Sequence, residues 1–270
     1  MKLSYTDSEI DRWRKKSQRR LLRWGPQSTA HVVEFMDDVG FCFASKGEST
    51  ELPSLWFASR GWNGITRGES ENALLATERV YYGRVLRRRP TLISPEYLPY
   101  FYALQGHHGK RDDFVREYTL GRLSMDGKIV MNQLVRASSR SSRELREEWP
   151  GSPLTDIRRL ERAMMELELK LFITRVHSHE SRHSSWSTVH ESFPAAVRKA
   201  RRITAESARA EILKRFFRNQ LVVTVGDIHH VLGWKKPAIY QALGALVQSG
   251  HISPHAKVNG MNTNYYCLVH

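Results

Sequence analysis

The chain has 270 residues and a formal net charge of +14, from 42 Lys and Arg against 28 Asp and Glu. Its only two cysteines, Cys42 and Cys267, have no paired spacing, which argues against disulfides and thiolate zinc sites. No apolar run approaches the ~20 residues that a membrane span needs. The first residues lack the apolar core of a signal peptide, so we expect a cytoplasmic protein without a membrane partner.

A positive surplus of this size favours a polyanionic partner, and nucleic acid is the commonest one. The alternative is that the charge only keeps the chain soluble. The length leaves room for about two domains with an ample core.

The first part of the chain divides into a basic segment, residues 1–27, and a helical domain with a short strand, residues 28–120. A helix is predicted over Thr29–Val39 and should end at Gly40, because glycine tolerates the left-handed backbone of a helix end. The apolar run Phe41–Ala44 then predicts a short strand.

Residues 45–71, rich in Gly and Ser, are predicted to be a loop. Helices are expected over Asn72–Arg89 and Pro95–Leu104. Arg87–Arg89 would lie at the end of the first, where three guanidinium groups could clamp a phosphate run while Tyr81 and Tyr82 stack on a base. Alternatively, the arginines cap the helix and the tyrosines lie in the core.

Residues 121–191 are predicted to form one winged helix-turn-helix unit. Its helices are expected over 127–135, from 141 and from 152, followed by wing strands over 171–176 and 185–189. The third helix presents Arg158, Arg159 and Arg162. DNA contact and a solvated surface are equal alternatives there, because Asp156 would repel phosphate.

Four histidines of this unit lie close together in the sequence: His177, His179, His183 and His190. The first two could face one side of a strand as a metal pair. No cysteine is near, and we prefer a polar wing with spare histidines, so no metal site is expected.

Residues 192–270 begin with a helical linker, 192–203, and continue as a second winged helix-turn-helix unit. Helices are predicted over 206–219, 227–234 and 235–250, and the strands that follow are separated by Asn259-Gly260, a strong turn signal. The fold class is therefore mainly α with small β wings, in tandem winged helix-turn-helix units.

In this second unit, the helix predicted over 235–250 would enter the DNA groove. Its residues outside the apolar face include Lys235, Lys236, Tyr240 and Gln241, and Lys257 lies in the wing. Lysine can reach phosphate, and glutamine can bond adenine through two hydrogen bonds. We expect these residues to contact double-stranded DNA, and the alternative is a solvated surface that packs on another domain.

No nucleotide-binding loop or serine-nucleophile elbow occurs, and no cofactor is expected. The carboxylates that could serve acid–base chemistry are Glu34, Asp37 and Asp38. A helix surface supplies such residues routinely.

Three places carry a family resemblance: the helix from Thr29 to Gly40 with Phe41-Cys42-Phe43 after it, Tyr81-Tyr82 followed by Thr91–Pro99, and the helix-turn-helix pair. From about Ser28 onward the chain resembles the AlkZ/YcaQ-like family of bacterial DNA glycosylases. The resemblance implies tandem winged-helix units and hydrolysis of the bond between a damaged base and its sugar. It also implies a Gln-x-Gln-type motif just after the first helix, where this chain has Phe41-Cys42-Phe43.

Three hypotheses follow. The first is a DNA-binding protein of glycosylase-like architecture, acting near the nucleoid in repair or regulation and excising no base. The second is a glycosylase for alkylated or crosslinked bases, in which Glu34, Asp37 or Asp38 replaces the glutamine pair and the base enters an aromatic pocket. The third is a protein-interaction module, since winged helices also bind proteins.

Overall fold

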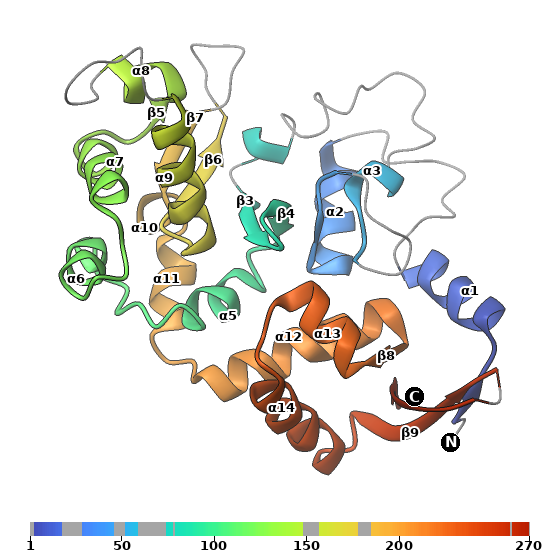
Figure 1. Cartoon of the computed structure of the whole chain (residues 1–270). Coiled ribbons are helices and arrows are strands. Elements are labelled where there is room, and N and C mark those ends of the chain that lie inside the picture. The colour runs from blue at the N-terminus through green and yellow to red at the C-terminus, as the bar shows by residue number, and fades with distance from the viewer. Residues whose placement is uncertain are drawn as a thin grey trace. The chain divides into compact units, whose positions relative to one another are not determined.

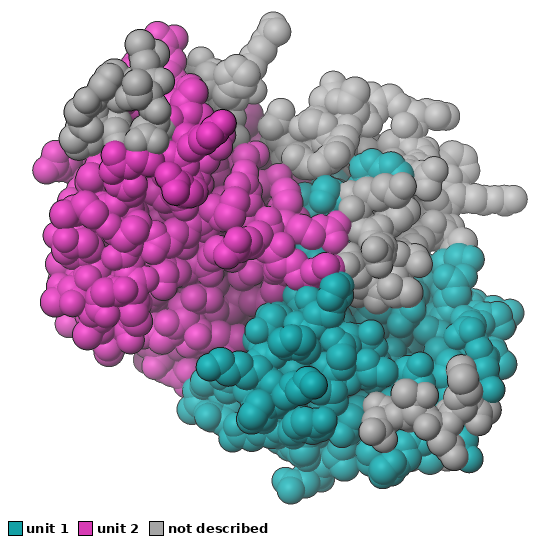
Figure 2. Space-filling view, in the orientation of Figure 1, with its two compact units in different colours: residues 1–70, 204–270 teal, residues 71–203 magenta. Residues whose placement is uncertain are grey.

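The computed structural model forms two compact units, which are residues 1–70 with 204–270 and residues 71–203 (Figure 2). Among the residues described, no helix is long and apolar enough to cross a membrane. The segment boundaries predicted after residues 27, 120 and 191 stay predictions. The structure describes residues 3–17, 29–45, 52–58, 74–77, 79–147, 157–177, 185–259 and 261–269.

The C-terminal part of the first unit confirms the predicted helix, helix, helix and hairpin, and adds a short strand (Figure 1). Thr224 and Asp227 form a reciprocal capping box that starts the second helix, and Gly233 ends it with a φ of 72°. The elements are α12 (Ala205–Gln220), β8 (Val222–Thr224), α13 (Val225–Leu232), α14 (Lys236–Gln248), β9 (Ile252–Val258) and β10 (Met261–Leu268).

The N-terminal residues complete this unit. β1 (Ser4–Tyr5) pairs in parallel with β9, which gives the sheet the strand order β1-β9-β10-β8. α1 (Asp7–Ser17) packs on α12, and the indole nitrogen of Trp13 donates to the carbonyl oxygen of Arg218 at 2.9 Å. Residues 3–17 are therefore a structural part of this unit, although the sequence marks them only by their charge.

The predicted helix and strand that follow are confirmed as α2 (Thr29–Val39) and β2 (Phe41–Phe43). Gly40 between them has a φ of 76°. Asn219 of α12 donates from its amide nitrogen to the carbonyl oxygen of Val39 at 2.9 Å and so anchors the end of α2. A short helix, α3 (Leu55–Ala58), comes next.

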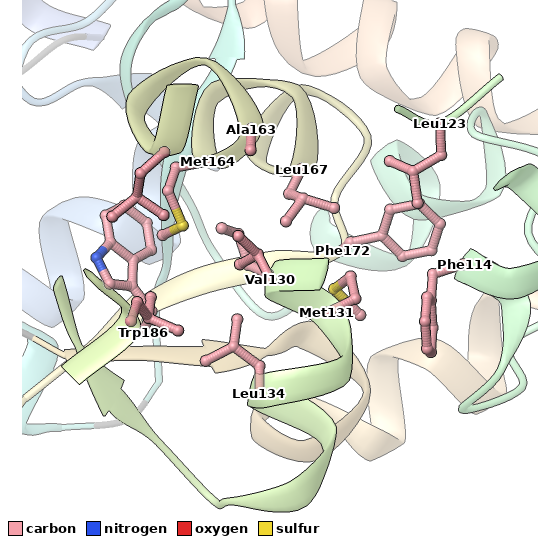
Figure 3. Close-up of a cluster of buried hydrophobic side chains, with 13 residues drawn as sticks. Phe114, Leu123, Val130, Met131, Leu134, Ala163, Met164, Leu167, Phe172 and Trp186 are labelled. Carbon is pink, nitrogen blue, oxygen red and sulfur yellow. The ribbon is translucent and has the colours of Figure 1, made fainter. Parts of the chain in front are cut away.

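The second unit contains the other predicted set of helices and strands. The third helix is described from Ile157 onward, so its predicted start at residue 152 and Asp156 lie outside the described residues. Figure 3 shows its buried core, in which side chains of the first and third helices face each other. The elements are α7 (Met125–Arg136), β5 (Arg140–Ser141), α8 (Ser142–Glu147), α9 (Ile157–Leu169), β6 (Ile173–Val176) and β7 (Ser185–Thr188), with the strand order β5-β7-β6.

One predicted helix of this unit is wrong. Over residues 81–89 the chain forms the hairpin of β3 (Tyr81–Leu86) and β4 (Arg89–Ile93), where a helix was predicted over Asn72–Arg89. β-branched and aromatic side chains prevail here, and they favour a pleated, half-buried strand. Within the predicted helix, residues 74–76 are the only described residues that are helical.

Short helices make up the rest of the second unit. The helix predicted over Pro95–Leu104 is confirmed as α5 (Leu98–Ala103), and α11 (Pro194–Ala200) confirms the helical linker. The two pack together, and Lys199 lies 5.3 Å from the ring centre of Tyr100. The remaining helices are α6 (Asp113–Thr119) and α10 (Val189–Ser192).

The same order of elements recurs along the chain. Helix, strand, two helices and two strands follow one another in α12 to β10 and again in α7 to β7. In both sheets the first strand of the set pairs with the last, and the last pairs with the middle one. A third stretch, from α2 to β4, runs helix, strand, short helix, helical turn, strand, strand.

Candidate nucleic-acid interface

α14 presents two chemically different faces. Ile239, Ala242, Leu243 and Leu246 are buried, and the predicted contact residues Lys235, Lys236, Tyr240 and Gln241 are all exposed. Lys257, on the neighbouring strand β9, is exposed as well. The exposed side of α14 therefore combines ammonium groups that can reach phosphate with an amide that can bond a base edge.

α9 also exposes its predicted residues, but its charges are partly neutralised. Arg158, Arg159 and Arg162 are exposed. Arg159 forms a two-bond ion pair with Asp126 of α7, in which its Nε lies 2.9 Å from Oδ2. Arg162 donates from Nε to the carbonyl oxygen of Arg158 at 3.2 Å. Arg159 is therefore held by a carboxylate of its own unit.

Arg87 and Arg88 occupy the two-residue turn between β3 and β4, where Leu86 pairs with Arg89. Helix capping by these arginines, the alternative considered from the sequence, is wrong because no helix ends here. Both turn residues are exposed and left-handed, with φ of 53° and 56°. Tight hairpin turns of this kind favour Asn-Gly, since a side chain makes the conformation costly. Two arginines at such a turn are a strained arrangement.

Tyr81 and Tyr82 lie in the core and are not available to stack on a base. Tyr81 is completely buried, and its hydroxyl donates to the carbonyl oxygen of Glu168 at 3.2 Å. Tyr82 is 5% exposed, and the guanidinium of Arg175 lies 5.1 Å from its ring centre. Their role is to attach β3 to α9 and β6.

The weak catalytic candidates lie on the surface of α2. Glu34, Asp37 and Asp38 are exposed, and the backbone carbonyl of Asp38 accepts a hydrogen bond from Arg215. The strand after this helix, Phe41–Phe43, is completely buried, in contrast to these exposed carboxylates. Burial also raises the pKa of the Cys42 thiol well above its usual value. The place where the family resemblance implies glutamines is thus a filled apolar core.

A buried carboxylate of the second unit is one that the sequence analysis did not select. Glu168 of α9 is 1% exposed, and its Oε2 lies 3.6 Å from Nε of Arg84. Burial raises its pKa to about 7, against the attraction of Arg84 and Arg175. A signal existed, because Glu168 continues the buried row of Leu160 and Met164 at a spacing of four residues.

The described residues contain no group of three His, Cys, Asp or Glu side chains that could hold a metal ion. His179 and His183 lie outside the described residues, and His177 and His190 are half-buried.

The predicted contacts therefore form three local sets. The first unit carries the α14 residues and Lys257, and the second carries the α9 arginines and the β3–β4 turn. The residues of each set belong to a single helix or hairpin, except that Lys257 lies on β9, which packs on α14.

The chain is similar over its whole length to a solved structure, Streptomyces sahachiroi DNA glycosylase AlkZ, with a TM-score of 0.66 and 13% sequence identity. The alignment covers 100% of this chain and 71% of that one, which establishes a shared fold. No curated protein sequence matches significantly.

A family model described as AlkZ related matches residues 26–222. This match includes α2, β2, the whole second unit and α12, so it spans most of the elements described above. The chain belongs to the AlkZ-related family.

Proposed function

We propose that this protein binds double-stranded DNA, and that α12 to β10 is a winged helix-turn-helix with α14 in the major groove and the β9–β10 hairpin as its wing. The observation that carries the proposal is the two-faced α14. Its apolar residues are buried on the sheet and α12, whereas Lys235, Lys236, Tyr240 and Gln241 face solvent. This is the arrangement by which such a unit reads a groove.

The second unit extends the proposal. The recurrence of the element order and of the strand order supports a tandem winged helix-turn-helix in α7 to β7. Arg87 and Arg88 at the β3–β4 turn add a phosphate contact to this unit, because strained backbone clusters at functional sites and guanidinium groups bind phosphate well.

The proposed role is DNA binding in repair or regulation without base excision. The relative with the shared fold is named a DNA glycosylase. In this chain, however, Phe41-Cys42-Phe43 offers no group that could position an attacking water, and the strand is inaccessible. A cytoplasmic location near the nucleoid is part of the same proposal.

The test replaces Lys235 and Lys236 with Ala and measures duplex DNA affinity by fluorescence anisotropy at several salt concentrations. Each lost phosphate contact should lower the salt slope by about 0.9, because fewer counterions are released. The matched control is Arg12→Ala with Lys16→Ala, which removes the same charge from exposed positions of α1 in the same unit.

The proposal requires a lower slope in the α14 variant and a smaller change in the α1 variant. Equal slopes in the wild type and the α14 variant would remove α14 from the interface. Absence of any salt-dependent DNA binding by the wild type would remove DNA as the partner and favour the protein-interaction hypothesis.

A further inference from the structure

A hollow of about 400 Å³ opens on the first unit, where the start of α13, the second turn of α14 and the β9–β10 hairpin meet. The residues that line it include the aromatic residues Tyr240, His255, Tyr265 and Tyr266, together with Gly226. Tyr240 is 55% exposed. A large ring so exposed beside other rings is an arrangement typical of a binding surface.

Irregular backbone brings these rings together. Tyr265 pairs with Ala256 and Cys267 with Ser253, so β9 has one more residue than β10 between those pairs. His255 lies in this bulge with a φ of 64°, which a histidine adopts only at a cost. Bulges redirect side chains, and they occur often beside functional sites.

The neighbouring strand is short. β8 ends at Thr224, opposite Tyr265, so the sheet edge beyond this pair is uncovered by β8. Consecutive residues of a strand normally point to opposite faces. At this uncovered edge both Tyr265 and Tyr266 border the same hollow.

The chemistry of the wall indicates the occupant. Among the described residues that line the hollow there is no Lys, Arg, Asp or Glu. The carboxylate of Asp227, three residues after the lining residue Thr224, is engaged in the α13 capping box, where its Oδ2 accepts from the backbone nitrogen of Thr224 at 2.7 Å. A phosphate would gain little from such a wall, whereas a flat ring with polar edges could stack on tyrosine and bond hydroxyl or imidazole groups.

The surroundings are basic. Lys236 precedes Tyr240 by one helical turn on α14, and Lys235 comes immediately before Lys236. The hollow therefore lies beside the groups assigned to phosphate contact, and it suits the uncharged part of a nucleotide.

We propose that this hollow receives one unpaired nucleobase of a DNA strand whose phosphates contact the start of α14. This inference rests on the proposed function, and it specifies the substrate as duplex DNA with an extrahelical base. It places the base between the start of α13, α14 and the β9–β10 hairpin.

The experiment compares a duplex with the same duplex containing one extra, unpaired thymine, by fluorescence anisotropy. The wild type should bind the second DNA about tenfold more tightly, since one stacked base contributes a factor of that order. Tyr240→Ala and Tyr266→Ala should each reduce this preference. Tyr240→Phe should retain it, because the ring remains.

Two further variants separate this inference from the proposed function. Gln248→Ala changes an exposed residue at the end of α14, which is not among the residues that line the hollow, and should keep the preference. Lys235→Ala with Lys236→Ala should weaken binding to both DNAs by the same factor. An equal loss on both DNAs would support contact of the α14 lysines with DNA phosphates, and would show that the preference for the unpaired base does not depend on these lysines.

A covalent readout locates the base. 5-Iodouracil at the unpaired position, irradiated in the complex, should crosslink to Tyr240 or Tyr266, as found by mass spectrometry of the peptides. Equal affinity of the wild type for both DNAs, or a preference that survives both Tyr→Ala changes, would overturn the inference and leave DNA binding by α14 standing. Failure to bind either DNA would overturn the proposed function itself.

Discussion

α9 and α14 occupy the same place in two sets of elements with the same order, but their charges are used differently. α14 exposes Lys235 and Lys236 at its start. α9 exposes arginines, yet Arg159 is paired with Asp126, and the helix buries a carboxylate, Glu168. If Ala163 is aligned with Ala242, Glu168 corresponds to Val247. A shared topology thus fixes where a helix packs, and individual residues decide whether its surface suits a polyanion.

The buried carboxylate gives the largest expected difference between the two helices. Glu168 has a pKa of about 7 in the folded chain, against an ordinary value of 4.5. The folded state therefore holds a proton that the unfolded state releases between these values. The contribution of Glu168 to the free energy of unfolding is therefore fully present below pH 4.5 and is lost as the pH rises through 7. The free energy of unfolding falls by at most about 3 kcal/mol over this range.

Glu168→Gln should remove this dependence. We expect the variant and the wild type to have similar free energies of unfolding at pH 5, and the variant to be the more stable at pH 8. Urea denaturation at both values measures it. A variant that is less stable than the wild type at pH 8 would show that the ion pair with Arg84 outweighs the cost of burying the charge.

The contrast between the two hairpins shows what the sequence could predict. The β9–β10 turn contains Asn259-Gly260, and the prediction there is confirmed for the described strands. The β3–β4 turn is Arg87-Arg88, which carries no turn signal, so the sequence predicts a helix across β3 and this turn. Helices with a clear apolar face, such as α12, were found from periodicity alone.

Other elements depend on contacts that no local pattern reveals. β1 has two residues and exists through its pairing with β9, about 250 positions later in the chain. The rings around the hollow meet because of the bulge at His255, which a sequence pattern does not indicate. The surface residues of α14 could be predicted, because burial of one helical face leaves the other to solvent.

The turn of the β3–β4 hairpin gives the next largest effect. Arg87→Asn with Arg88→Gly introduces the pair that this turn favours, and should raise the free energy of unfolding by about 1–2 kcal/mol. The same change should lower duplex DNA affinity at low salt, because two cations are lost. Urea denaturation and anisotropy on one preparation measure both.

Replacing both residues with Gln is the matched control, since it removes the charge and keeps side chains at the strained positions. It should lower the affinity without raising the stability. Unchanged DNA affinity in both variants would limit this turn to a structural role.

A smaller effect is expected from the Asp126–Arg159 pair, which distinguishes α9 from α14. Asp126→Asn removes the carboxylate that holds Arg159, and should make the salt slope of DNA binding steeper by about 0.9 if Arg159 gains one phosphate contact. The fold should change by less than about 1 kcal/mol, because the Arg159 side chain is 44% exposed. Asp112→Asn, at an exposed position of the same unit, controls for the change in net charge. Equal slopes for the two variants would show that α9 does not contact DNA.

The smallest expected effect is on base excision, where we predict no release of N3- or N7-alkylated purines above the rate of the DNA alone. An attacking water needs a base within hydrogen-bond reach. Phe41–Phe43 is completely buried and apolar, and Glu34, Asp37 and Asp38 are exposed on α2. Single-turnover incubation with alkylated duplex, followed by chromatography of free bases, measures the release.

The combined variant Glu34→Gln, Asp37→Asn and Asp38→Asn should behave as the wild type does, and its DNA affinity should show that it is folded. Base release by the wild type that this variant abolishes would establish the glycosylase hypothesis, and would assign the chemistry to α2 in place of the missing glutamines.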